Sequence, residues 1–390
     1  MSAPAGAHTV RRHNLGIVLR QVATDGPVSR ARVAELSGLT RGTVSSLVEQ
    51  LLAGSLLEEL EADRGVPGRP ANPVQLSRSG PAALGLELNV DHASACVLDL
   101  SGAVRVLRTI PSDESSWSTP AAGLDGVAEL ATQVLAQASG LWPVAAVVAV
   151  AGVVDRAGVL QRAPNLPGWA GLDVGRELAA RLGLDVRAGN EADLGALGEL
   201  WFGGFDGRRD FLHVSGEIGV GAGIVLGGSL FGGGAGRAGE LGHVVVDPGG
   251  AVCSCGGRGC LEQVAGQRAL LAAAGVATVA ELEAAALGGN ARALAALAGA
   301  GAALGLAVAG AVNLLDVPAV VLGGVHARLG RWLVPPIVAE LAARSLGGAQ
   351  PDVLVSALGS QAAVRGAAGS VVRSVLDDPG GHLARWTGAG

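Results

Sequence analysis

The sequence contains no lysine and no tyrosine, a single methionine, and few aromatic residues of any kind (3%). All 28 basic residues are therefore arginine, which indicates a biased Ala/Gly/Arg composition rather than a functional signal. Charged residues are scarce at 16%, but hydrophobic residues make up 49% of the chain, which excludes an intrinsically disordered protein. Only four cysteines occur in 390 residues, and a chain of this length buries enough apolar surface to fold without a disulfide framework.

The net charge of −6 argues against a protein that coats nucleic acid with its whole surface, but the charges are unevenly distributed. Residues 1–80 carry 9 arginines against 7 acidic residues, whereas residues 81–390 carry 19 against 27. Between residues 11 and 48 the balance is 6 arginines to 2 acids. We therefore expect a local basic surface near the N-terminus.

Two segments bear on membrane targeting. Residues 1–14 contain no apolar core of the kind found in a secretory signal peptide. Residues 293–315 are uncharged and long enough to cross a bilayer, but they are mostly alanine and glycine and include Asn313. We interpret this stretch as a helix packed inside a large core, and we expect a soluble cytoplasmic protein with no membrane partner.

The first fifty residues have the spacing of a helix-turn-helix. Apolar residues between Leu15 and Val22 recur at helical intervals and predict a first helix. Ser29 can cap a second helix over residues 30–37, and Thr40 can cap a third after a short turn that contains glycine. Two short helices joined by such a turn are typical of proteins that place the second of them in the major groove.

The exposed leading edge of the third helix is small, polar and basic, and its candidate DNA-binding residues are Thr40, Arg41, Thr43, Ser45 and Ser46. Small residues allow close approach to the groove, whereas the guanidinium and the hydroxyls reach phosphates or base edges. A helical bundle used only for dimerisation is the alternative. The clustering of polar and basic residues on one edge favours DNA binding.

A wing is predicted after the third helix. Leu56–Leu60 and Pro73–Leu76 can form two strands around a loop that contains Gly68-Arg69-Pro70. An extended arginine in such a loop suits a narrow minor groove, so Arg69 joins the candidate DNA-binding residues. We therefore expect residues 1–80 to form a winged helix-turn-helix domain and residues 81–390 to form a second domain.

The remainder of the chain repeats one pattern of strands and helices. The first series of apolar strands is Leu84–Val90, Ala93–Leu100, Val104–Ile110 and Val144–Val154, with a helix over about residues 120–138. The second series is Phe211–Ser215, Gly221–Leu226, Ala319–Leu322 and Val353–Leu358, with a helix over residues 293–315. Two copies of a strand meander with a helix predict an α/β duplication with a cleft between the halves.

One histidine and three cysteines provide the strongest chemical signal: His243, Cys253, Cys255 and Cys260. Three thiolates and an imidazole nitrogen at this spacing can enclose one ion in a tetrahedral site, which suits structural Zn²⁺. Free thiols or a disulfide are the alternative, but a reducing cytoplasm disfavours a disulfide and three cysteines leave one unpaired. Cys96 stands alone in a strand pattern and is expected in the core.

The segment from Glu240 through these ligands to Glu262 resembles the signature of the ROK family (repressors, open reading frames and sugar kinases). Ala163–Trp169 resembles the sugar-contact loop of the family, and Asn313–Asp316 with Val320–Gly324 resembles its nucleotide-side strand. Four N-terminal motifs resemble the winged helix of its repressors: Asn14, Ser29-Arg30, Thr43-Val44-Ser45 and Gly68-Arg69-Pro70. The resemblance covers nearly the whole chain and implies an actin-like ATPase-type, sugar kinase-like duplication.

The resemblance also implies the ligand contacts. A hexose or pentose bound between the lobes would meet Asn165, Asn190, Glu191, Glu240, His243 and Glu262. His243 would also serve as a zinc ligand in the loop 240–262, and Arg30 would join the DNA-binding residues. Ordinary loop acids at 240 and 262, and a turn residue at 165, are the simpler alternatives.

Three departures from the kinases of the family predict a sensor and not an enzyme. Glu87–Asp91 reads Glu-Leu-Asn-Val-Asp where the kinases have Asp-x-Gly-Gly-Thr, so the glycines that admit a phosphate are missing. Glu217 replaces a threonine of the second phosphate loop. Glu191 replaces the catalytic aspartate, which moves the carboxylate by about an ångström. The same Asn-Glu-Ala arrangement is typical of the family's xylose repressors.

These observations predict a sugar-responsive transcriptional regulator, most simply a repressor without catalytic activity. We expect it to bind double-stranded operator DNA as a homodimer or homotetramer and to respond to an aldose of the xylose or glucose type. An active ATP-dependent sugar kinase fused to a DNA-binding domain is the alternative. A repressor that has lost its ligand is a third reading.

Overall fold

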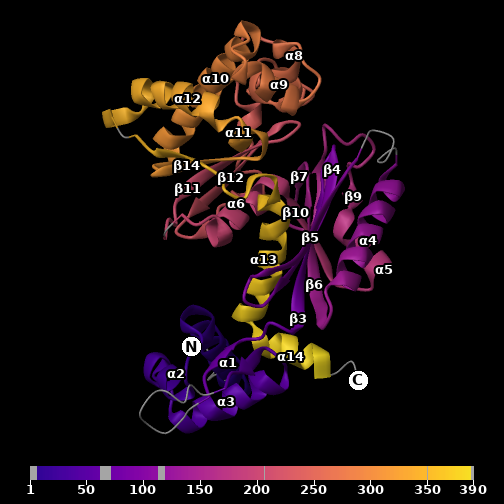
Figure 1. Ribbon diagram of the computed structural model, residues 1–390, viewed down its shortest axis with the longest axis vertical. Helices are drawn as coiled ribbons and strands as arrows, with labels where there is room; N and C mark the ends of the chain where they lie inside the picture. The colour runs from indigo at the N-terminus through magenta and orange to yellow at the C-terminus, as the bar shows by residue number, and fades with distance from the viewer. Residues whose placement is uncertain (1–6, 62–71, 113–118, 206, 349, 388–390) are drawn as a thin grey trace.

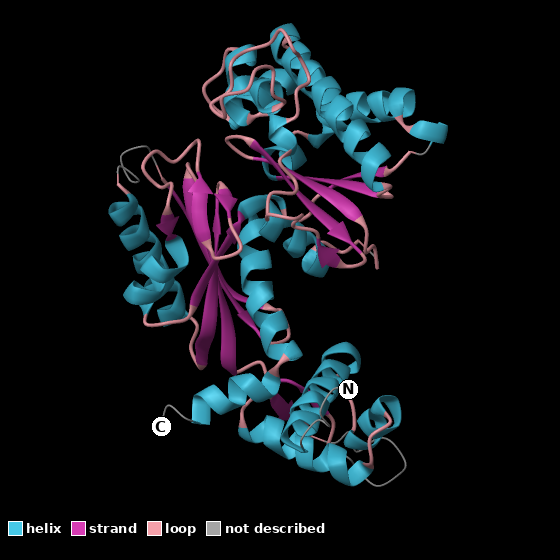
Figure 2. Cartoon of the chain, turned by 180° about the vertical axis from the view of Figure 1, so that it is seen from behind, coloured by secondary structure: helices cyan, strands magenta, loops and turns pink. Residues whose placement is uncertain are grey.

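The computed structural model describes residues 7–61, 72–112, 119–205, 207–348 and 350–387. Along its longest axis the chain forms three parts, namely a small N-terminal unit, a first α/β lobe and a second α/β lobe (Figure 1). The last helix, α14 (Pro379–Thr387), returns to the N-terminal unit. Both ends of the chain therefore lie at the same end of the molecule (Figure 2).

The N-terminal unit has the predicted winged helix-turn-helix fold. Its elements are α1 (Ala7–Asp25), α2 (Arg30–Ser37), α3 (Arg41–Ala53), β1 (Leu57–Glu59) and β2 (Val74–Leu76). Ser29 and Thr40 cap α2 and α3 through their side-chain oxygens, and Gly38 reverses the chain between them with a φ of 71°. The strands pair antiparallel as the base of the wing. Arg69 at the predicted wing tip lies outside the described residues.

The first lobe is built on a five-stranded sheet in the order β10-β6-β3-β4-β5. Its strands are β3 (Gly80–Leu88), β4 (His92–Asp99), β5 (Val104–Pro111), β6 (Leu141–Val150) and β10 (Val186–Asn190). Two helices, α4 (Pro120–Gln137) and α5 (Val174–Leu182), pack on this sheet. Apolar side chains from both layers, such as Leu84, Leu130 and Val148, form the core between them.

The predicted strand Val144–Val154 is wrong in its length. Strand β6 ends at Val150, and β7 (Val153–Val154) belongs to a separate small sheet with β8 (Val159–Arg162) and β9 (Leu172–Asp173). Between them Gly152 has a φ of 148°, and its carbonyl oxygen accepts a 2.7 Å hydrogen bond from Asn190 Nδ2. A run of valines cannot reveal this break, because the break depends on a partner from another strand.

The second lobe is built on the sheet β13-β12-β11-β14-β15. Its strands are β11 (Phe211–Gly216), β12 (Val220–Leu226), β13 (Ser229–Leu230), β14 (Ala319–Gly323) and β15 (Asp352–Val355). Its helices are α7 (Glu262–Ala265), α8 (Gln267–Ala274), α9 (Val279–Leu287), α10 (Ala291–Leu315), α11 (Gly324–Arg328) and α12 (Gly330–Arg344). Short 3-10 turns span Leu241–His243, Leu346–Gly348 and Gly359–Gln361.

The two large sheets have the same topology, which confirms the predicted duplication. Each has an antiparallel meander of three strands, a fourth strand that pairs in parallel with the first strand of the meander, and a fifth that pairs in parallel with the fourth. Two further helices, α6 (Glu191–Phe202) and α13 (Ala362–Asp377), join the lobes. Helix α13 packs on the first sheet, α6 packs on β11 and β12 of the second sheet, and the two helices pack on each other.

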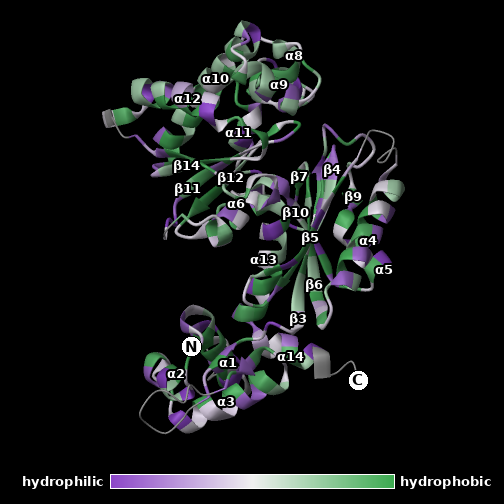
Figure 3. Cartoon of the chain, in the orientation of Figure 1, coloured by the Kyte–Doolittle hydropathy of each residue, from purple (hydrophilic) through white to green (hydrophobic). Residues whose placement is uncertain are grey.

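Helix α10 contains the long uncharged stretch. By length and composition it is apolar enough to cross a membrane, and half of its most apolar 18-residue window is buried in the protein. Leu297, Leu304 and Val308 lie fully buried in the core of the second lobe, where α10 packs against α12. The helix is therefore a core helix, as predicted. Figure 3 shows that the strands of both large sheets are also rich in hydrophobic residues.

A buried histidine in β11 makes this core sensitive to acid. The ring of His213 is 1% exposed, and methyl groups at Gly195 of α6 or Gly323 of β14 would lie within 3 Å of it. Its Nδ1 has no hydrogen-bond partner among the described residues. Burial, together with the nearby His326, lowers the pKa of His213 to about 4.

We predict that His213 contributes to acid denaturation. Below pH ~6.5 the unfolded chain binds a proton at this residue that the native protein excludes, so the free energy of unfolding falls as the pH drops toward 4. Between pH 7.5 and 5 this one residue should cost about 2 kcal/mol. Urea unfolding of His213→Gln should therefore show a smaller loss over this interval than the wild type. His13→Gln, at an exposed imidazole, is the control, and equal losses in all three proteins would contradict the assignment.

Candidate functional site

A cavity of about 250 Å³ lies between the two lobes. All six residues predicted to contact sugar line it, although they come from separate elements: Asn165, Asn190, Glu191, Glu240, His243 and Glu262. The first three belong to the first lobe and the start of α6, and the last three to the second lobe. A cavity of this size suits one small polar ligand. The roles of the six residues remain predictions.

The start of α6 forms the inner wall of the cavity. Asn190 caps this helix by accepting a hydrogen bond from the Asp193 amide, and its Nδ2 donates to the Gly152 carbonyl. Its amide group is therefore largely committed to bracing the backbone. Glu191 follows as the first helical residue, and its Oε1 accepts a 3.3 Å hydrogen bond from Ser215 Oγ. Burial and the nearby Glu87 raise the pKa of Glu191 to about 7.

The opposite wall combines residues from both lobes. A methyl group at Gly219 would collide with Glu262 Oε2 and would lie 3.6 Å from Asn165 Nδ2, so the absence of a side chain there leaves room for both polar groups. Glu240 precedes the 3-10 turn after β13 and His243 ends it, with Oε2 of Glu240 3.8 Å from Nε2 of His243. Burial raises the pKa of Glu240.

Sequence reasoning missed two arginines that line the cavity, Arg162 and Arg237. Arg162 Nη2 donates a 3.1 Å hydrogen bond to the Cys255 carbonyl and so connects β8 of the first lobe with the cysteine loop of the second. Both arginines are exposed. No sequence signal marks them, because arginine is the only strongly basic residue type in this chain and occurs throughout it.

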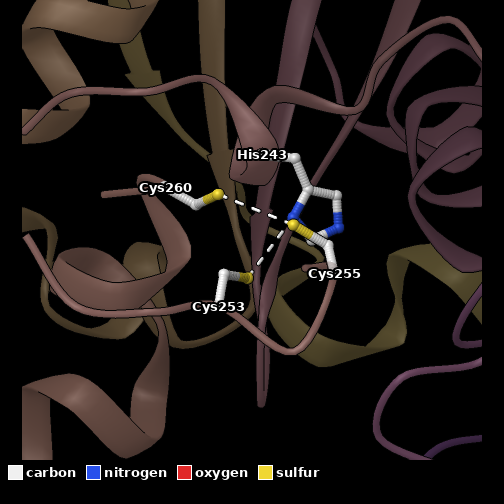
Figure 4. Close-up of side chains that lie close together, drawn as sticks. All are labelled: His243, Cys253, Cys255 and Cys260. Carbon is white, nitrogen blue, oxygen red and sulfur yellow. Dashed lines mark hydrogen bonds between the residues drawn. The ribbon is translucent and has the colours of Figure 1, made fainter. Parts of the chain in front are cut away.

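The four predicted metal ligands lie close together (Figure 4), and two of them, His243 and Cys255, also line the cavity. Their ligand atoms are all within 4.8 Å of one another, and the cysteines form no disulfide. Cys255 Sγ lies 3.7 Å from Cys260 Sγ, and Cys253 Sγ lies 3.8 Å from His243 Nδ1. These distances match the edge of ~3.8 Å expected for a tetrahedron with Zn–S bonds of ~2.3 Å. The cluster can therefore hold a metal ion, and its donor set suits zinc.

The surrounding residues support a metal at this position. The Gly257 amide donates to Cys255 Sγ at 3.3 Å, and a methyl group at Gly257 would lie 3.3 Å from two of the sulfurs. His243 directs Nδ1 to the cluster and Nε2 to Glu240, which is the usual arrangement of a metal-bound imidazole with a carboxylate partner. Cys260 is followed after one residue by Glu262, so the cluster and the cavity share one short loop.

Acidic side chains stand at the positions that the sequence predicts to correspond to the kinase phosphate loops. Glu217 lines both the sugar-sized cavity and a second cavity of about 550 Å³, whose walls also include Asp91 and His92. A methyl group on Gly324 would collide with Glu217 Oε1, so this carboxylate occupies the space over the glycine that follows β14. Burial and Glu191 raise the pKa of Glu217 well above its usual value. A phosphate entering here would meet this carboxyl group.

Sequence reasoning missed the role of His92 in the same region. Its Nδ1 lies 2.8 Å from Asp91 Oδ1 and its Nε2 lies 3.3 Å from Glu87 Oε1. Burial lowers the pKa of His92, but the hydrogen bonds to these two carboxylates outweigh it and raise the pKa to about 11. The imidazole is therefore charged at neutral pH and partly balances the surrounding acids.

Five of the predicted DNA-binding residues lie along one edge of the N-terminal unit, at the start of α3: Thr40, Arg41, Thr43, Ser45 and Ser46. Thr40, Arg41 and Ser46 are exposed, whereas Thr43 and Ser45 are half-buried. Ser46 Oγ accepts a 3.2 Å hydrogen bond from Arg11 of α1, so Arg11 also belongs to this edge although sequence reasoning did not select it.

Arg30 has a different environment from the other residues of this edge. Its guanidinium pairs with Glu49 of α3 and Glu59 of β1 at 2.6 and 2.5 Å. These pairs brace α2 against its neighbours, so a contact between Arg30 and a phosphate would require the guanidinium to leave two carboxylates.

Comparison with known proteins identifies the family. Residues 83–373 match the model of the ROK family, and the chain belongs to that family. It is 29% identical over 264 residues to the xylose repressor of Bacillus subtilis (strain 168), an alignment that covers 67% of this chain and 68% of the relative.

Solved structures of ROK family proteins are also similar to this chain, and they cover different shares of it. A ROK family transcriptional regulator, a homolog of the E. coli MLC protein, superposes on 97% of this chain and 98% of its own, with 26% identity and a TM-score of 0.79. A ROK family glucokinase from Streptomyces griseus in complex with glucose and AMPPNP covers 74% of this chain and 98% of its own, with 27% identity and a TM-score of 0.65. The former match therefore includes the N-terminal unit.

We predict that the purified protein contains about one equivalent of zinc per chain, because one imidazole nitrogen and three thiol sulfurs lie within 4.8 Å of one another. Cys255→Ser should lower the zinc content and the thermal stability, since it removes one of three thiolates. Elemental analysis after gel filtration measures the metal. Cys96→Ser, at a buried cysteine outside the cluster, should keep its zinc. A wild-type protein purified without chelator and holding far less than one equivalent would contradict the prediction.

Proposed function

We propose that this protein is a sugar-responsive transcriptional regulator that acts as a repressor. The observation that carries the proposal is the contrast between two neighbouring regions: a cavity lined by polar groups that suit a sugar, and phosphate-loop positions occupied by Glu217 and by Glu87–Asp91. Ligand binding without phosphoryl transfer is the function that such a cleft supports. Similarity to a xylose repressor and to a ROK transcriptional regulator supports the same conclusion.

In this proposal an aldose binds between the lobes, with a pentose such as xylose as the first candidate and glucose as the next. Glu240 and Glu262 accept hydrogen bonds from adjacent hydroxyl groups, and Asn165 and His243 complete the contacts. Glu191, with its pKa of about 7, can donate or accept at neutral pH. An epimer would leave a buried acceptor without a partner, which gives discrimination between sugars.

We assign the metal cluster a structural role. A bound Zn²⁺ would be held by His243 and the three cysteines, and it would supply rigidity to the loop without taking part in a reaction. The loop carries Glu262 on one side and receives the hydrogen bond from Arg162 on the other. Loss of the metal would therefore weaken sugar binding indirectly.

The N-terminal unit supplies the DNA-binding surface in this proposal. Residues 1–80 would act as the DNA-binding domain and residues 81–390 as the sugar-binding domain of a cytoplasmic regulator. Arg41 and the hydroxyls near it would enter the major groove, and Arg69 would enter the minor groove. A homodimer, or a homotetramer built from two such dimers, would present α3 of each subunit to half-sites about 34 Å apart.

The sugar dependence of operator binding tests this function. With an operator selected from a random duplex library, saturating D-xylose or D-glucose should change the operator Kd by about tenfold to hundredfold, or ~1.4–2.7 kcal/mol. Glu262→Gln should weaken sugar binding in calorimetry and leave the Kd for operator without sugar nearly unchanged, because its carboxylate faces the cavity. Fluorescence anisotropy measures the DNA affinity.

Arg41→Ala is the complementary control, since it should weaken operator binding and leave sugar affinity intact. An operator affinity that stays constant across millimolar aldoses and their phosphates would refute the regulatory role of the cavity. The protein would then be a repressor without a sugar ligand.

An active sugar kinase is the second candidate function, because a ROK glucokinase is also similar to this chain. We predict no sugar phosphorylation, since Asn89 and Val90 replace the glycines that admit a phosphate, and the carboxyl groups of Asp91 and Glu217 line the cavity where it would lie. Glu191→Asp should not restore activity, because it leaves both loops unchanged. A coupled assay with ATP and a panel of aldoses measures turnover. A rate of roughly 1 per second or faster in the wild type would favour the kinase.

A further inference from the structure

Helix α6 connects the cavity to the centre of the molecule. It begins at Glu191 in the cavity wall, and the cap at Asn190 fixes its first turn to Gly152 of the first lobe. From there the helix runs along β11 and β12 of the second sheet. A ligand that contacts Glu191 therefore acts directly on an element that packs against both lobes.

Helix α13 packs against α6 with the two backbones in direct contact. A methyl group at Gly198 would collide with the Ala362 carbonyl, and one at Gly366 would collide with the Leu194 carbonyl. On its other side α13 lies equally close to β3, where a methyl group at Gly85 would collide with the Val364 carbonyl. Because no flexible side chains separate the backbones at these glycines, we expect a displacement of α6 to move α13 as well.

The far end of α13 is part of the core of the DNA-binding unit. Val375 and Leu376 belong to the same cluster of buried side chains as Leu15 and Leu19 of α1, and the cluster extends without interruption to Leu194 of α6. After α13 the chain turns at Asp378, whose carboxylate pairs with Arg12 of α1. The DNA-binding unit is therefore joined to the first lobe by a shared core and not only by the chain connection at residues 77–80.

Helix α14 then reaches the recognition helix itself. Leu383 is buried against Gly54, which ends α3, and a methyl group at Gly54 would collide with Leu383 Cδ2. Figures 1 and 2 both show α13 descending along the first sheet to α14, which lies against the N-terminal helices. The C-terminal helices thus link the joint between the lobes with the C-terminal end of α3, the helix proposed to bind DNA.

We propose that α13 and α14 are the path by which cavity occupancy controls DNA binding: movement at the α6–α13 joint repositions α3 through the contact of Leu383 with Gly54. The inference rests on the proposed function and names its regulatory element. The contact does not itself touch sugar or DNA. Its alteration should therefore change the coupling between the two ligands and leave each separate affinity largely intact.

A reciprocal size exchange tests this contact. Leu383→Ala opens a gap beside α3, and Gly54→Ala introduces a collision, but in the double variant the new methyl group at 54 occupies the space left by the leucine. Gly54 has ordinary dihedral angles (φ −87°, ψ 8°), so alanine is tolerated there. Leu282→Ala in the buried face of α9 and Gly299→Ala at an open position of α10 are matched controls in the second lobe.

The first readout needs no sugar. Hydrogen exchange of the α3 amides in the full-length protein should become at least about fivefold faster in Leu383→Ala and return toward the wild-type rate in the double variant. The second readout is the ratio of operator Kd values with and without saturating D-xylose or D-glucose. If this ratio is about tenfold or more in the wild type, it should fall below about threefold in Leu383→Ala and recover to more than about fivefold in the double variant. The sugar affinity measured by calorimetry should stay unchanged in both variants.

The outcomes separate this inference from the proposed function. Unchanged exchange in α3 of Leu383→Ala overturns the inference whatever the sugars do. Faster exchange with a full sugar response in Leu383→Ala also overturns it, because coupling then bypasses α14. If exchange responds as expected but no sugar alters operator binding in the wild type, the proposed function fails while the mechanical link between α14 and α3 stands. An equal loss of response in Leu282→Ala would indicate general destabilisation and would also contradict the path.

Discussion

The arrangement of the whole molecule depends on the close packing of α13 between the first sheet, α6 and the N-terminal unit. Glycines at 85, 198 and 366 bring backbones into contact that a single methyl group would separate. Because the same helix is shared by the joint between the lobes and by the core under α1, neither can be displaced independently of it. The close packing thereby attaches the N-terminal unit rigidly to the two-lobed cleft.

The cleft itself is organised by carboxylates. Besides burial, Glu87 raises the pKa of Glu191 and Glu191 raises the pKa of Glu217, while His92 is held charged by Asp91 and Glu87. Buried acids of this kind need a proton, a cation or a hydrogen-bond donor. Sugar hydroxyls provide such donors and phosphates do not. This requirement is the physical basis for the proposal that the cleft binds a neutral polyol and not a polyanion.

The metal cluster shows why some sites are readable from sequence. Its four ligands lie within eighteen residues, and glycines such as Gly257 let the loop wrap closely around the sulfurs. Such a site is nearly local, so spacing and residue type were sufficient to predict it. The sugar-sized cavity differs, because its walls come from both lobes and meet only after the sheets have formed. The resemblance to the ROK family supplied those residues, and periodicity alone could not have supplied them.

The sequence by itself determined the winged helix-turn-helix, the duplicated α/β lobes and the cluster of one histidine and three cysteines, because caps, hydrophobic periods and residue spacing act over short stretches of chain. Tertiary structure decided what distant residues do to one another. It interrupted the run of valines at Gly152, gave His92 two carboxylate partners, committed Arg30 to Glu49 and Glu59, and placed Leu383 against the end of α3. Apart from the short-range contacts of His92, these contacts join positions that are far apart in the sequence, and only the folded packing of the helices and sheets brings them within reach.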